Sequence, residues 1–130
     1  MGAMTSAQVT AIGGLNAATL TLDASASNLA NADDVSAVGG PPAYNPVAVQ
    51  QSARPGGGVI ATAVTLKPSQ LLAYDPNSPV ANAAGLVQAP EIDPVSEVTN
   101  QLVAGQNFAY SLTALKAANE EQQALLDMTT

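Results

Sequence analysis

The spacing of apolar residues predicts a long helix near the amino-terminal end, over about residues 5–31. Apolar or small side chains recur there at alternating steps of three and four residues, which is typical of one helix face. These positions are Ile12, Leu15, Thr19, Leu22, Ala26 and Leu29. Ser6 is expected to cap the start of this helix, and residues 31–34 to end it. Gly13 and Gly14 each weaken it by about 1 kcal/mol relative to alanine, so the helix needs a packing partner.

A second helix is predicted over about residues 94–128. Pro94 suits a first helical turn, Asp93 can cap it, and Glu97 places a carboxylate near the positive end of the helix dipole. One face carries Val95, Val98, Leu102, Ala109 and Leu112, with Gly105 at the intervening position. A helix of this length spans roughly 50 Å, which is more than a compact domain of this size requires.

The middle of the chain, residues 35–93, is predicted to be rich in turns and short strands. Prolines and glycines cluster at residues 39–42, 55–58 and 75–79, where they prevent long helices. Residues 58–66 alternate as a strand does, and residues 44–50 alternate in part, so a hairpin with a loop of about seven residues is expected. Residues 71–74 are expected to form a third short extended segment.

These patterns predict an α+β fold, in which long N- and C-terminal helices pack as a coiled-coil-like pair beside a small β-rich middle segment. Residues 1–3 resemble a cloning remnant. Residues 4–34 form an N-terminal helical assembly segment, residues 35–93 a hairpin- and loop-rich middle, and residues 94–130 a C-terminal helical assembly segment. The helical faces can be buried against each other, against the middle segment or against neighbouring molecules.

Composition favours burial between molecules. Aromatic residues make up 3% of the chain and tryptophan is absent, so a lone monomer has a thin core. Charged residues make up 10%, against about 25% in typical soluble domains, so much of the surface is expected to be covered in the working state. We therefore expect an assembly interface made by both helices. It comprises Ile12, Leu15, Leu22, Ala26, Leu29, Val95, Val98, Leu102, Ala109 and Leu112.

Charge and missing residue types exclude several functions. The net charge is −7, and only Arg54, Lys67 and Lys116 could meet phosphates, so neither nucleic acid nor an anionic membrane is an expected partner. The chain has no cysteine and no histidine, which excludes thiolate chemistry and imidazole acid–base catalysis. No apolar run is long enough to cross a membrane, and no secretory signal pattern is expected at the start.

The remaining candidates for chemistry are weak. The acidic pairs Asp33-Asp34 and Glu120-Glu121 fit solvated surfaces, because adjacent helical residues do not face each other. The glycines at 56–58 precede a strand, and no Lys-Ser/Thr follows them, so they lack the features of a phosphate loop. The turn that begins at Asp75 lacks the glycine and glutamate of a calcium loop. The sequence therefore predicts no enzyme, no cofactor and no metal site.

Two stretches resemble a known family. The run Ala26-Ser27-Asn28-Leu29-Ala30-Asn31 is similar to the amino-terminal signature of flagellar rod and hook proteins. The stretch from Tyr74-Asp75-Pro76 through Gly85 to Pro90-Glu91-Ile92-Asp93 resembles the C-type proximal rod subunit. Residues 106–111 replace the arginine-x-tyrosine-glutamate-alanine-asparagine stretch usual in the last helix. The chain thus resembles the flagellar basal-body rod family.

The resemblance implies a structural subunit of the proximal rod, located in the periplasmic part of the basal body. It implies export by the flagellar type III apparatus, assembly with other rod subunits and with copies of the chain, and transmission of torque through packed helices. The isolated termini are expected to be mobile and to become helical on assembly. The alternative is a secreted, non-enzymatic binding or adhesion module.

Overall fold

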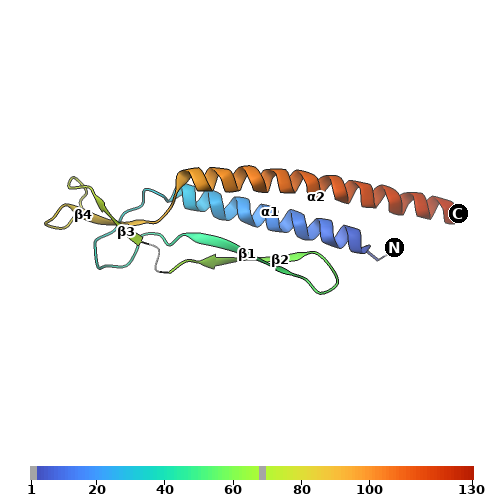
Figure 1. The fold of residues 1–130 in the computed structure, drawn as a ribbon, viewed down its shortest axis with the longest axis horizontal. Coiled ribbons are helices and arrows are strands. Elements are labelled where there is room, and N and C mark those ends of the chain that lie inside the picture. The colour runs from blue at the N-terminus through green and yellow to red at the C-terminus, as the bar shows by residue number, and fades with distance from the viewer. Residues whose placement is uncertain (1–2, 68–69) are drawn as a thin grey trace.

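The protein is an elongated molecule with a helix pair along one side (Figure 1). The computed structural model describes residues 3–67 and 70–130, so the expected remnant at residues 1–3 lies mostly outside the described part. In chain order the elements are α1 (Ser6–Ala30), β1 (Val47–Ala53), β2 (Val59–Thr65), β3 (Gln70–Tyr74), β4 (Leu86–Pro90) and α2 (Pro94–Thr129). Two terminal helices and a small middle of two antiparallel sheets confirm the predicted α+β fold.

Helix α1 begins with a capping box. The Thr5 hydroxyl accepts a hydrogen bond from the Gln8 backbone N–H at 3.2 Å, and the Gln8 side chain accepts one from the Thr5 N–H at 2.8 Å. The prediction that Ser6 caps the helix is therefore wrong. Thr5 has a glutamine three residues later that can return the bond, whereas Ser6 has Val9 there. Asn31 ends the helix as the C-cap.

Helix α2 begins and ends close to the predicted positions. The Asp93 carboxylate accepts a hydrogen bond from the Val95 N–H at 3.1 Å, Pro94 occupies the first turn, and Glu97 is the acidic residue of that turn. With 36 residues, α2 is longer than the 25-residue α1. Because Gln8 lies beside Asn119 and Gln122, the last turns of α2 extend past the start of α1 (Figure 1).

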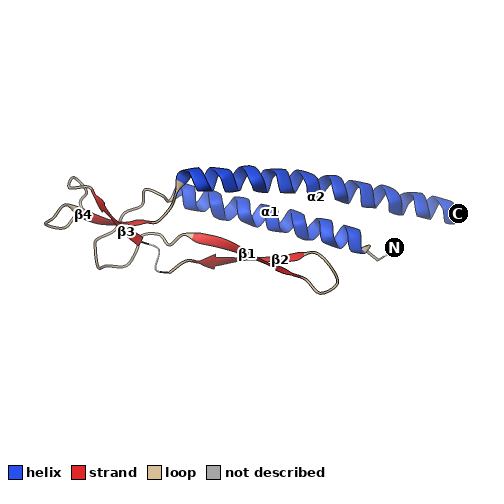
Figure 2. Cartoon of the chain, viewed as in Figure 1, coloured by secondary structure: helices blue, strands red, loops and turns tan. Residues whose placement is uncertain are grey.

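Strands β1 and β2 form the predicted hairpin, with Val47 opposite Thr65 and Ala53 opposite Val59. Strand β1 begins at Val47, whereas the predicted strand over residues 44–50 begins three residues earlier. Proline has no N–H to give to a ladder, so the strand starts after Pro46. The hairpin runs alongside α1, and its turn reaches the start of that helix, where the Thr10 side chain and backbone approach Gly57 and Gly58 (Figure 2).

Strands β3 and β4 form a second hairpin at the opposite end of the molecule. The sequence predicted β3, but it did not predict β4. The backbone of Gln88 in β4 exchanges two hydrogen bonds with Ser36, so the chain segment after α1 covers the outer edge of this strand. A five-residue strand is too short to show a clear alternation, and pairing with β3 and Ser36 stabilises it.

The core is thin, as composition predicted. The buried apolar residues of the described chain are six alanines and one valine: Ala11, Ala17, Ala18, Ala24, Ala104, Ala118 and Val87. Val87 is the largest side chain that is fully buried, whereas eighteen large apolar residues are exposed. In the described part of the chain, no helix is long and apolar enough to cross a membrane.

Candidate assembly interface

The contact between α1 and α2 is built from small and polar side chains. On α1 the buried Ala11, Ala18 and Ser25 recur every seven residues, and on α2 Ala104 and Ala118 are buried fourteen residues apart with the half-buried Ser111 midway. A Cβ atom at Gly14 would collide with the Ser111 side chain. The two helices therefore pack closely because neither carries a large side chain at these positions.

Polar bonds fix the register of the antiparallel pair at both ends. At one end, the Gln8 amide donates to Asn119 Oδ1 at 2.6 Å and to Gln122 Oε1 at 2.8 Å. At the other end, the Ser25 hydroxyl donates to the Glu97 backbone carbonyl at 2.8 Å. Gln8 and Ser25 are both buried, so leaving either side chain unpaired would destabilise the pair.

Asn28 joins three elements at the end of the molecule where α2 begins. Its Oδ1 accepts hydrogen bonds from the Val47 N–H at 2.8 Å and from the Tyr44 hydroxyl at 2.7 Å. Its Nδ2 donates to the Val47 carbonyl at 2.8 Å and to Glu97 Oε1 at 3.1 Å. The side chain is 3% exposed. Asn28 therefore attaches β1 and α2 to α1 at one point.

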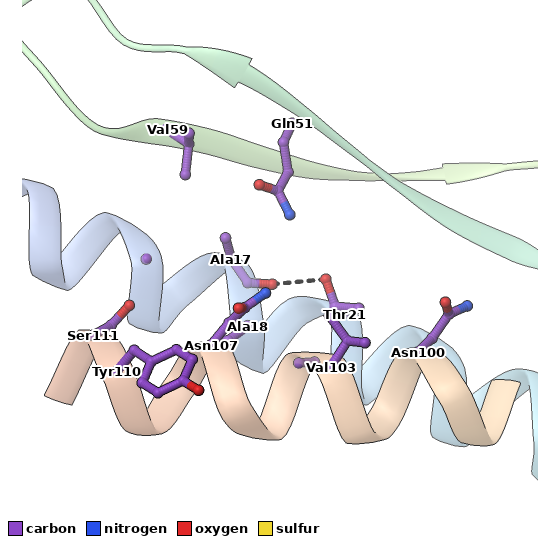
Figure 3. Close-up of a pocket in the computed structure, with 12 residues that line it drawn as sticks. Ala17, Ala18, Thr21, Gln51, Val59, Asn100, Val103, Asn107, Tyr110 and Ser111 are labelled. Carbon is purple, nitrogen blue, oxygen red and sulfur yellow. Dashed lines mark hydrogen bonds between the residues drawn. The ribbon is translucent and has the colours of Figure 1, made fainter.

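A groove of about 380 Å³ separates the β1–β2 hairpin from α2 along one side of α1 (Figure 3). Alanine and valine side chains supply much of its lining, and its polar side chains are Thr21, Gln51, Asn100, Asn107, Tyr110 and Ser111. The Thr21 hydroxyl at its floor donates to the Ala17 carbonyl at 2.9 Å (Figure 3). Of the described residues that line the groove, none carries a carboxylate, an amine or a guanidinium.

The predicted interface residues of α2 are exposed and do not form the contact with α1. Val95 is 74% exposed, Leu102 is 68% exposed, and Val98, Ala109 and Leu112 are exposed as well. We call the face made by Val95, Val98, Leu102, Gly105, Ala109 and Leu112 the outer α2 stripe. It is an apolar surface that the described chain leaves uncovered, and its role as a partner surface remains a prediction.

The predicted interface residues of α1 differ in burial and do not lie on one exposed surface. Leu15, Leu22 and Leu29 are half-buried and flank the contact with α2. Ile12 is half-buried in a second groove, between α1 and strand β2, and Ala26 is exposed. The buried face is rotated from the predicted one, and it consists of alanines, a serine and a glutamine. Periodicity of large apolar residues could not find this face, because its close approach depends on small side chains.

Sequence reasoning also missed how much of the structure depends on polar groups. It placed the end of α1 at residues 31–34, and Asn31 is the C-cap, whereas the bond from Asn28 to Glu97 on α2 was not foreseen. It did not identify Gln8, Tyr44 or Glu97 as partners in the contacts between elements. For Gln8 a signal was present in the sequence, because it lies three residues after Thr5, which is the spacing of a capping box.

Within the described residues, no group of three or more acidic side chains is arranged to hold a metal ion. The ionisable residues are dispersed over the surface, whereas the buried polar residues, Gln8, Ser25 and Asn28, are engaged in structural hydrogen bonds. The fold is that of an elongated protein in which a helix pair leaves an apolar face uncovered, as in structural proteins.

Comparison with known protein sequences shows which structural proteins the chain is related to. It is 36% identical to the flagellar basal-body rod protein FlgC of Salmonella typhimurium over 99 residues. The aligned region covers 72% of this chain and 74% of that protein. It is 36% identical to FlgC of Escherichia coli O157:H7 over 106 residues, 78% of this chain and 79% of that protein. A shorter match, 36% over 67 residues, reaches FlgC of Bacillus subtilis, with 51% of this chain and 45% of that protein. The chain belongs to the FlgC family of flagellar basal-body rod proteins. No protein-family model matches it.

Proposed function

We propose that this structural subunit of the flagellar basal-body rod assembles through its two terminal helices and transmits torque through their packed faces. Membership of the FlgC family makes the chain a rod component located in the basal body and not an enzyme. The relatives give no support to the alternative of a secreted adhesion module.

One observation carries the assembly mechanism, namely the contrast between a core of small residues and an exposed apolar helix. The largest fully buried side chain is Val87, while Val95, Leu102 and Leu125 are each more than 60% exposed. Burying apolar area contributes about 25 cal/mol per Å². Large apolar side chains therefore remain on the surface of the folded monomer, where other rod subunits can cover them.

The segments have separate roles in this proposal. Residues 4–34 and 94–130 supply the assembly helices, and residues 35–93 pack beside them. The interface consists of the outer α2 stripe together with Ile12, Leu15, Leu22, Ala26 and Leu29. The partners in this assembly are other rod subunits and copies of the chain, and the assembly takes place in the periplasm. The flagellar type III apparatus exports the chain in an unfolded state. A thin monomer core supports such export, because little free energy opposes unfolding.

The experiment compares Leu102→Asp with wild type. Circular dichroism and sedimentation velocity follow helix content and association from micromolar to millimolar concentration. Wild type should gain helix content as it associates, because ordering and burial are coupled. Leu102→Asp should leave the dilute spectrum unchanged, since the side chain is exposed, and should weaken association.

A matched control is Leu72→Asp, because Leu72 is 58% exposed but lies on β3, away from the helices. It should associate as wild type does. Equal loss of association in both variants would contradict assembly through the helices, and a helical, concentration-independent wild-type monomer would contradict the coupling of folding to assembly.

A further inference from the structure

The β3–β4 sheet lies at one end of the molecule, where it contacts neither helix and neither strand of the first hairpin (Figure 2). Its two outer edges differ. On the β4 side, the Gln88 backbone exchanges hydrogen bonds of 2.8 and 2.9 Å with Ser36, and the Gln88 side chain donates to the Ser36 hydroxyl and the Gly40 carbonyl at 3.3 Å each. On the β3 side, no strand of the described chain covers the edge.

The hydrogen bonds of β4 determine which backbone groups β3 presents at this free edge. Alternate residues of an antiparallel strand direct both N–H and C=O to the same side. Gln88 directs them away from β3, and so does Leu86, which accepts from the Asn82 N–H at 3.0 Å and donates to Asn82 Oδ1 at 2.9 Å. Their partners across the sheet, Leu72 and Tyr74, therefore direct their N–H and C=O groups outward.

This edge lacks the features that usually prevent strand pairing. Proteins protect exposed strand edges with proline, lysine or other charged residues, and β3, with the sequence QLLAY, contains none of them. Leu72 is 58% exposed and Tyr74 is 74% exposed, and both side chains lie on the same face of the sheet as Leu86. An added strand would gain main-chain hydrogen bonds along the edge and apolar contacts on this face.

Carboxylates flank both ends of the free edge. Asp75 directly follows β3, and Glu91 directly follows the β4 residue that is paired with the first residue of β3. Both are exposed, and the adjoining segments carry three more exposed carboxylates, Asp33, Asp34 and Asp93. The nearest cation along the chain is Lys67, three residues before β3. A segment that brings lysine or arginine to this edge would meet complementary charge.

A second copy of the chain does not supply such a segment. The four strands have the sequences VAVQQSA, VIATAVT, QLLAY and LVQAP, and none of them contains a charged residue. Each copy also has a net charge of −7, so the acidic ends of two copies repel each other. Charge therefore favours a different protein as the occupant of the edge.

We propose that the free edge of β3 accepts an extended segment of a different protein as an added strand, apolar at its centre and carrying lysine or arginine near both ends. The backbones of Leu72 and Tyr74 bond its main chain, their side chains pack against its apolar residues, and Asp75 and Glu91 face its basic ends. This contact goes beyond the proposed function, because it uses neither terminal helix and its partner is not a copy of the chain.

The first test titrates the isotope-labelled full chain, at a concentration where it is monomeric, with the peptide Lys-Thr-Val-Thr-Val-Thr-Lys. The amide resonances of Leu72 and Tyr74 should shift, and their hydrogen exchange should slow by at least about tenfold at saturation. A matched peptide with glutamate at both ends should bind at least about fivefold more weakly at low salt. No binding at millimolar peptide, or equal binding of the two peptides, would overturn the proposal.

The second test concerns the backbone. Leu72→Pro removes one outward N–H but no bond of the β3–β4 ladder, and proline is tolerated at a free edge. The Val87 amide should stay protected from exchange, while the lysine peptide should bind at least about tenfold more weakly. Leu72→Thr keeps the N–H, so it should weaken binding less. Equal loss in both variants would overturn main-chain pairing, and weaker self-association of Leu72→Pro would overturn the choice of partner.

The third test changes charge and leaves β3 itself intact. Asp75→Lys should weaken binding of the lysine peptide by about three- to tenfold and strengthen binding of the glutamate peptide. The control Asp127→Lys makes the same change in net charge on an exposed residue near the end of α2, and it should change either affinity by less than about twofold. Equal effects of the two substitutions would overturn the role of charge at this edge.

Discussion

Replacing Asn28 by alanine tests whether one amide connects the hairpin to the helix pair. The substitution removes four hydrogen bonds, two with the Val47 backbone, one from the Tyr44 hydroxyl and one to the Glu97 carboxylate. Each such bond contributes about 0.5 to 1.5 kcal/mol net, and partners left buried without water cost more. Because water can reach part of the site, we expect the free energy of unfolding to fall by about 2 to 4 kcal/mol.

The assay is urea unfolding followed by circular dichroism, at a concentration where the helices are formed, together with hydrogen exchange of the β1 amides. Asn31→Ala is the matched control, because among the described residues the Asn31 side chain bonds just the Ser27 carbonyl of its own helix. That variant should lose about 1 kcal/mol or less. The amides of β1 should exchange faster in Asn28→Ala before the helices melt. A difference of less than about 0.5 kcal/mol between the variants would refute the reasoning.

Three further substitutions test other contacts. Gln8→Ala removes a capping box and two bonds to α2, so the first turn of α1 should lose hydrogen-exchange protection and stability should fall by about 1 to 2 kcal/mol; unchanged protection would contradict this. Gly14→Ala should destabilise the chain by about 1 to 3 kcal/mol in urea unfolding despite better helix propensity, and adding Ser111→Gly should recover part of the loss. Gly85→Ala should loosen the β3–β4 hairpin by about 1 to 2 kcal/mol, seen as faster exchange at Val87, because Gly85 has φ +77° and its Cβ would lie 2.8 Å from the Tyr74 ring.

The helices and the first hairpin were predictable because their signals are local. Asp93, Pro94 and Glu97 mark the start of α2 within a few residues. The alternation of residues 58–66 marks β2 in the same way. The capping residue of α1 was assigned one position late, since the choice between Thr5 and Ser6 depends on which residue lies three positions further on.

The face on which α1 meets α2 was not predictable from large apolar residues. It is the alanine, serine and glycine positions, such as Ala18, Ser25 and Gly14, that allow two backbones to approach. Strand β4 was missed for a related reason, because its partners, β3 and Ser36, are distant in the sequence. The apolar residues of α2 could be listed from the sequence, but the sequence alone left open whether α1 or another molecule covers them. In the structure they are exposed, and their role as a partner surface stays a prediction.

The unequal length of the two helices affects how neighbouring subunits could be joined end to end. Gln122 accepts a hydrogen bond from Gln8 in the first turns of α1, and about seven residues of α2 continue beyond Gln122, a length of about 10 Å. If two subunits met only through helix ends of equal length, bending would pull that end-to-end contact apart. We expect a neighbouring subunit to pack alongside the projecting turns, in a contact that bending and twisting would load in shear along the helix. Leu125 and Met128 on this projection supply apolar area for such a contact.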